Sequence, residues 1–144
     1  MYQVVRGGYH FIECGVPYHH FSFTSYVSEL IRRFTGLNDF GCSRFPMNGP
    51  YSSYAGALYF CPPEWLITGK YCAGPATVWK MGVLMYWLLF GDYPFKSVGD
   101  WQLHYPFNVE VSGDCLSLIS GCLKEDPEER LKFDQILDHM YFLA

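Results

Sequence analysis

The sequence has few charged residues and no excess of positive charge. Only 17% of its 144 residues are charged, and 10 Lys and Arg residues stand against 14 Asp and Glu residues, a formal net charge of −4. Proteins that bind nucleic acid without sequence preference gain affinity by neutralising phosphates with basic side chains. The composition therefore argues against a general nucleic-acid-binding protein.

The sequence also lacks paired metal-ligand motifs. No two of its six cysteines form a Cys-x-x-Cys pair, and no histidines stand at zinc-finger spacing. This pattern predicts ordinary thiols in a reducing compartment, so we expect a cytoplasmic protein, with the nucleus as a second location. The cysteines are Cys14, Cys42, Cys61, Cys72, Cys115 and Cys122.

No apolar run is long enough to span a bilayer. The most apolar stretch, residues 78–90, is too short and contains Lys80, and no secretory signal pattern opens the chain. We therefore expect no membrane partner. The chain is nevertheless 50% hydrophobic and 19% aromatic, enough apolar material for the core of one domain and for a surface that contacts a protein partner.

Three helices are predicted in the carboxy-terminal half. Residues 78–90 are apolar almost all the way round, as in a helix buried on every side, and Gly91 ends this run. Ser112 can cap a second helix over residues 112–123, where apolar residues follow an i, i+3, i+4, i+7 stripe. A third helix is expected over residues 133–141.

The amino-terminal half has weaker patterns. Residues 1–13 are compatible with a short helix, and residues 21–30 alternate polar and apolar side chains, which favours extended chain or a hairpin. Residues 35–63 are rich in Gly, Pro, Ser and Asn and have no sustained period. They predict a long loop, and loops of this length in compact domains are usually functional.

Two short motifs stand near the two ends of this loop: Asp-Phe-Gly at residues 39–41 and Pro-Pro-Glu-Trp at residues 62–65. Their order and spacing resemble the activation segment of protein kinases, which runs from Asp-Phe-Gly to an Ala-Pro-Glu-type motif. Within that family, the closest resemblance is to the Pim serine/threonine kinases. It rests on the Pro-Pro-Glu-Trp motif, on Val-Trp at 78–79, on Gly-Asp-x-Pro-Phe at 91–95 and on Ile-x-x-His at 136–139.

The resemblance implies a fold and a chemistry. We expect a mainly α, protein-kinase-like C-lobe, in which a helical bundle surrounds a buried central helix, with a long activation-segment loop and little β structure. Residues 1–144 would form a partial protein kinase domain from which the N-lobe is absent. The family reaction transfers the γ-phosphate of Mg·ATP to a Ser or Thr hydroxyl of a protein substrate. Asp39 would bind Mg·ATP, and Glu64 would pair with Arg130 as a structural anchor.

The same register reveals departures from the family pattern. Tyr18-His19-His20 falls where the family has His-Arg-Asp, so His20 takes the position of the catalytic aspartate, and we expect it to be inactive. Ser25 replaces the asparagine that holds the second Mg²⁺. With Asp39 left as the metal ligand, we expect weak Mg²⁺ binding and no binding of Mg·ATP by this chain alone.

Two classes of function therefore remain open. The chain is either a truncated Pim-like serine/threonine kinase, inactive as it stands, or a pseudokinase-like protein-interaction module or degenerate gene product. The sequence specifies no oligomeric state. Tyr51, Ser52, Ser53 and Tyr54 lie on the expected activation loop and are candidates for phosphorylation, where an added charge orders a loop if a basic cluster faces it.

Overall fold

The computed structural model describes residues 49–106 and 109–143. Within these ranges the fold is mainly α, and the only β pairing is an isolated antiparallel bridge between Tyr51 and Tyr71. The expected mainly α fold with little β structure is confirmed for this part of the chain. Its elements are η1 (Leu58–Phe60), α3 (Pro63–Thr68), α4 (Ala73–Phe90), α5 (Gly113–Cys122), α6 (Phe133–Leu137) and α7 (Met140–Leu143). The helix expected over residues 1–13 and the extended stretch over 21–30 lie outside the described residues.

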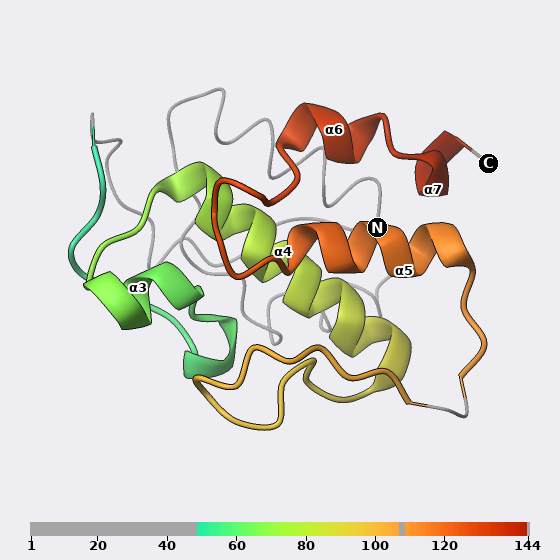
Figure 1. The fold of residues 1–144 in the computed structure, drawn as a ribbon, viewed down its shortest axis with the longest axis horizontal. Helices are drawn as coiled ribbons and strands as arrows, with labels where there is room; N and C mark the ends of the chain where they lie inside the picture. Colours follow the sequence, from blue (N-terminus) through green and yellow to red (C-terminus); the bar gives the residue numbers. More distant parts are fainter. Residues whose placement is uncertain (1–48, 107–108, 144) are drawn as a thin grey trace, which may run out of the picture.

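Helix α4 is the centre of the fold, as Figure 1 shows. It begins at Ala73, five residues before the predicted start, because Pro75 is tolerated within the first turn, where its missing N–H has no acceptor in the helix. Residues 76–86 are all buried, whereas residues 87–90 are half-buried or exposed, so the expected burial on every side holds for the first part of the helix only. Gly91 ends α4, as predicted. It adopts the left-handed conformation with φ 72° and donates its N–H to the Trp87 carbonyl.

Helix α5 packs across α4, and buried side chains of both helices form the main core. The Ser112 hydroxyl accepts a hydrogen bond from the Cys115 N–H at 3.2 Å, which confirms the predicted cap. The predicted apolar stripe of α5 is buried against α4. Its members are Cys115, Leu118, Ile119, Cys122 and the adjoining Leu123.

The single helix predicted over residues 133–141 is wrong in detail, because the chain forms two short helices, α6 and α7. The backbone leaves the helical path at residues 138 and 139. There the Nδ1 atom of His139 accepts a hydrogen bond from the Tyr141 N–H at 3.2 Å, so the imidazole caps the start of α7. A side chain that bonds the backbone nearby offers an alternative to the helical ladder.

The described part of the long loop is attached to the helices. Residues 49–57 lead into η1, and Cys61 and Pro62 lead into α3, which was not predicted from the sequence. Pro63 stands in the first turn of α3, a position that Pro favours, and Gly69 ends the helix with φ 69°. In Figure 1, η1 and α3 lie on one side of α4, and α6 and α7 lie on the other.

Candidate functional site

A paired acidic and basic side chain joins α3 to the carboxy-terminal half. The two terminal guanidinium nitrogens of Arg130 donate to the two carboxylate oxygens of Glu64, at 2.9 Å from Nη1 and 2.5 Å from Nη2. This parallel two-bond arrangement is the strongest form of an ion pair between these side chains. The Arg130 side chain is fully buried, and that of Glu64 is 10% exposed. The pair expected from the sequence is therefore present.

Arg130 also donates to three backbone carbonyls. Its Nε contacts the Lys124 oxygen at 2.7 Å, Nη1 contacts the Pro75 oxygen at 3.1 Å, and Nη2 contacts the Glu125 oxygen at 3.0 Å. Together with the two bonds to Glu64, these contacts use all five N–H donors of the guanidinium. One side chain thus fastens α3, the first turn of α4 and the turn after α5.

The face of the same guanidinium rests on an aromatic ring. The Arg130 Cζ atom lies 4.9 Å from the centre of the Trp79 ring, within the range of a cation–π contact. Trp79 is itself held by a parallel stack with Phe95, at 5.2 Å between ring centres. Burial of a charged group is costly unless it is paired and fully hydrogen-bonded, and these contacts meet that condition.

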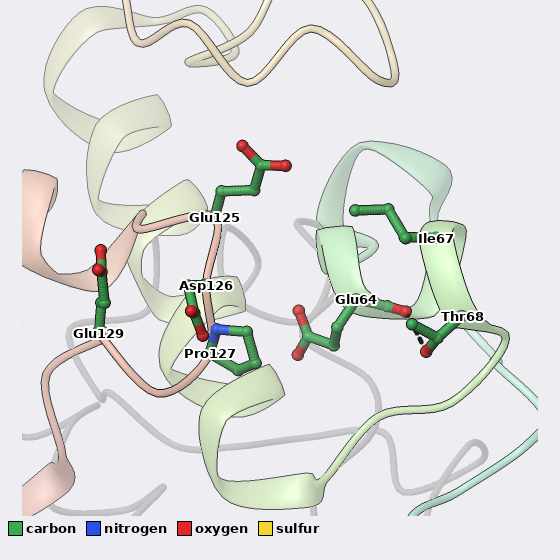
Figure 2. A pocket seen from close by; sticks show the side chains of 7 residues that line it. All are labelled: Glu64, Ile67, Thr68, Glu125, Asp126, Pro127 and Glu129. Atoms are coloured by element: carbon green, nitrogen blue, oxygen red, sulfur yellow. Dashed lines mark hydrogen bonds between the residues drawn. The ribbon is translucent and has the colours of Figure 1, made fainter.

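A groove of about 510 Å³ lies between α3 and the turn 125–129. Figure 2 shows Glu64, Ile67 and Thr68 on the α3 side and Pro127 on the opposite side. Glu125, Asp126 and Glu129 complete its lining. The described part of the chain contains no group of three His, Cys, Asp or Glu side chains that could hold a metal ion.

The structure does not describe the residues expected to take part in phosphate transfer. His20, Ser25 and Asp39 fall outside the described residues, so their expected roles stay predictions. No helix in residues 49–106 and 109–143 is long and apolar enough to cross a membrane.

A second cluster of aromatic side chains, which the sequence did not predict, surrounds the Tyr51–Tyr71 bridge. Tyr51 and Tyr71 are stacked at 5.6 Å between ring centres, and Tyr54 lies 5.4 Å from Trp65. The Lys80 Nζ atom lies 5.0 Å from the centre of the Tyr54 ring, and Lys80 is only 2% exposed. The feature of the sequence that could have indicated this cluster is Lys80, a single lysine within the apolar run of α4.

The described cysteines divide into buried and exposed thiols. Cys61, Cys115 and Cys122 are buried, whereas Cys72 is exposed. Burial raises the pKa of the Cys61 thiol to about 11 and that of Cys122 to about 12, against the opposing effect of the nearby Lys80 and Arg130 cations. Burial also raises the pKa of Cys115. Because the thiolate is the nucleophile, these three buried cysteines are structural groups.

Comparison with known proteins identifies the family. The model of the protein kinase domain matches residues 30–142. Over 106 residues, the chain is 40% identical to serine/threonine-protein kinase pim-2 of Danio rerio, an alignment that covers 73% of this chain and 34% of that protein. Over 118 residues, it is 37% identical to serine/threonine-protein kinase prk-2 of Caenorhabditis elegans, covering 78% of this chain and 27% of that protein.

A third relative is more distant. The chain is 31% identical over 109 residues to serine/threonine-protein kinase ppk6 of Schizosaccharomyces pombe, covering 74% of this chain and 14% of that protein. These alignments span about a third or less of the three relatives. The helical fold and the kinase domain match agree with a kinase C-lobe-like fragment. The chain belongs to the protein kinase family.

Proposed function

We propose that residues 1–144 form the carboxy-terminal part of a Pim-like serine/threonine protein kinase domain, and that this chain alone does not transfer phosphate. The observation that carries the family role is the Arg130 guanidinium, which donates two hydrogen bonds to Glu64 and three to backbone carbonyls. The similarity to pim-2 and prk-2 supports the subfamily. A cytoplasmic or nuclear location and a protein substrate or partner belong to the same proposal.

Glu64 and Arg130 act in this proposal as the anchor of the activation segment. Glu64 stands at the start of α3, directly after the segment, and Arg130 fixes it to the first turn of α4 and to the turn after α5. An anchor of this kind contributes by holding the segment that precedes α3 in one position. It moves no proton and contacts no phosphate, so it is a positioning device and leaves the chemistry to other residues.

The proposed inactivity rests on the residues expected at the reaction centre. Phosphoryl transfer depends on positioning and on charge stabilisation, and His20 stands where the resemblance places the aspartate that accepts the substrate proton. We expect no transfer from labelled ATP to a basic Ser/Thr peptide by the purified chain, under conditions in which a complete Pim-type kinase gives a clear signal. Transfer that is lost in the Asp39→Ala variant would show that the chain is a working enzyme.

Nucleotide binding provides a second test of the same proposal. When bound, Mg·ATP supplies the transferred phosphoryl group, and Asp39 and Ser25 are the residues expected to face its metal ions. A carboxylate and a hydroxyl hold Mg²⁺ weakly, because this ion keeps most of its waters and relies on phosphates for the rest. We expect millimolar Mg·ATP to leave the melting temperature of the chain unchanged, since the stabilisation vanishes when Kd far exceeds the ligand concentration.

The outcome that contradicts this expectation is specific. A rise of a few degrees that requires Mg²⁺ and disappears in the Asp39→Asn variant would establish a nucleotide site that uses this carboxylate. A rise that persists in that variant would place nucleotide binding away from Asp39, and either result would overturn the proposed absence of Mg·ATP binding.

A protein-interaction module is the second candidate function. Large apolar side chains are exposed near the end of the loop: Leu58 and Tyr59 on η1 are 54% and 51% exposed, and Ile67 on α3 is 66% exposed. Exposed apolar side chains of this size are available for contact with a protein partner. A protein-interaction module requires no catalytic aspartate, which agrees with the expectation that His20 stands at the position of that aspartate.

A further inference from the structure

The groove between α3 and the turn of residues 125–129 has two walls that one side chain holds together. The Nη2 atom of Arg130 donates to the Glu64 carboxylate on α3 at 2.5 Å and to the Glu125 carbonyl on the turn at 3.0 Å. The groove between these walls has a volume of about 510 Å³, within the range of sites that take small ligands. Because its walls are already fastened, a ligand that enters it has little of the chain to order.

The side chains that line the groove offer negative charge and hydrogen-bond acceptors. Four of the seven carry a carboxylate, namely Glu64, Glu125, Asp126 and Glu129. Arg130 neutralises Glu64, whereas the other three make no salt bridge with a described residue. The Thr68 hydroxyl already donates to the Glu64 carbonyl at 2.6 Å. A ligand that complements this lining must supply positive charge and donors.

The groove also has an apolar part. Ile67 is 66% exposed, the largest exposed fraction among the large apolar side chains of the described residues. Figure 2 shows Ile67 on the α3 side and the half-buried Pro127 on the facing turn. Covering an isoleucine with an apolar group is favourable, because it removes apolar surface from water. The groove therefore suits a ligand that has an apolar group beside its cationic groups.

We propose that this groove binds a basic segment of a partner protein, in which an apolar side chain stands next to arginines. The apolar side chain covers Ile67 and Pro127, and the guanidinium groups face the carboxylates of the turn 125–129. Arginine suits this role because its planar guanidinium donates two parallel bonds to one carboxylate. Binding of this kind needs no phosphate transfer, so it is separate from the proposed kinase function.

Other occupants match the groove less well. Its carboxylates repel anions, and the described residues include no group of three His, Cys, Asp or Glu side chains that could hold a metal ion. A second copy of the chain also carries a formal net charge of −4, so two copies repel each other. A cationic segment from a different protein has the complementary charge.

The test uses the full chain and a fluorescein-labelled peptide, Gly-Arg-Leu-Arg-Arg-Gly, which has no hydroxyl group and so cannot accept phosphate. Fluorescence anisotropy at low salt should give saturable binding with a Kd below about 100 µM. Kd should rise at least about threefold in high salt, which screens exposed charges. A peptide with glutamine in place of each arginine should not bind, and one with glycine in place of leucine should bind about fivefold more weakly.

Variants of the chain locate the binding site. Glu125→Gln and Glu129→Gln together should raise Kd about three- to tenfold, because neither carboxylate makes a hydrogen bond with a described residue and each loses only its attraction for arginine. Ile67→Ala should raise Kd about fivefold, because it removes the apolar surface that the leucine covers.

Matched controls change the same properties away from the groove. Glu110→Gln and Asp114→Asn together remove two exposed carboxylates, so the net charge changes equally. Met140→Ala removes another exposed apolar side chain, which is 59% exposed. Both controls should leave Kd unchanged.

Four results would overturn the proposal. Absence of saturable binding, or equal binding of the glutamine peptide, would exclude recognition of a basic segment. Equal loss in the control pair would show that net charge attracts the peptide, and not the groove. Competition by free arginine amide as effective as that by the unlabelled peptide would mean that no apolar neighbour is needed. A dimer in sedimentation velocity that Ile67→Ala disperses would place a second copy of the chain in the groove.

Discussion

Replacement of Arg130 with methionine is expected to lower the free energy of unfolding by about 3–5 kcal/mol, the cost of breaking a buried ion pair by removing one partner. The variant leaves the Glu64 carboxylate, 10% exposed, without its counter-charge, and leaves the Lys124, Pro75 and Glu125 carbonyls without this donor. Urea unfolding followed by circular dichroism measures the change. For a domain of this size, the loss corresponds to roughly 10–20 °C in melting temperature.

Two further variants separate charge from geometry. Arg130→Lys keeps the positive charge but replaces five N–H donors in a planar fork with a single ammonium group, so it should recover only part of the stability. Glu64→Gln removes the carboxylate charge and leaves Arg130 with its three carbonyl partners, so its cost should be smaller than that of Arg130→Met. Equal stabilities of Arg130→Met and the unmodified chain would contradict the role of the guanidinium as an anchor.

This anchor could be predicted in part from the sequence. Glu64 and Arg130 are 66 residues apart, and the sequence predicts their pairing because each stands in a recognisable motif. The carbonyls of Pro75, Lys124 and Glu125 could not be predicted, because every residue carries a carbonyl and only the folded backbone decides which of them point to one place. Motif resemblance thus identified the charged partners, and tertiary structure supplied the other three bonds.

The ends of the helices could likewise be predicted only where the signal lies in a few adjacent residues. The length of the apolar run and the glycine after it predicted the end of α4, and Ser112 predicted the start of α5, because these signals lie in a few adjacent residues. The break between α6 and α7 was missed, since histidine is an uncommon cap and the apolar positions continue on both sides of it. In the sequence, Lys80 is only a charged residue within an apolar run. Its place beneath Tyr54 depends on a contact between residues 26 positions apart.

The close approach of α4 and α5 gives the second large expected effect, which depends on Gly82. A Cβ atom at this position would lie 2.8 Å from the Cβ of Cys122 and 2.8 Å from the Cδ2 of Leu123. The Cys122 Cβ is bonded directly to the backbone of α5, so no side-chain rotation can move it away and the two helices must separate. Overpacking of this kind costs about 1–3 kcal/mol, against a gain of up to about 1 kcal/mol from the higher helix propensity of alanine.

Gly82→Ala is therefore expected to destabilise the chain by about 1–2 kcal/mol, although the same change in an open helical position is favourable. Gly74→Ala is the matched control in the same helix, because a Cβ atom there meets nothing within 4 Å. It should leave stability unchanged or raise it by about 0.5 kcal/mol. Thermal unfolding of the two variants beside the unmodified chain gives both values. If Gly82→Ala proved as stable as Gly74→Ala, the helices would not be in contact at Gly82, and the main core would have to be packed through other residues of α4.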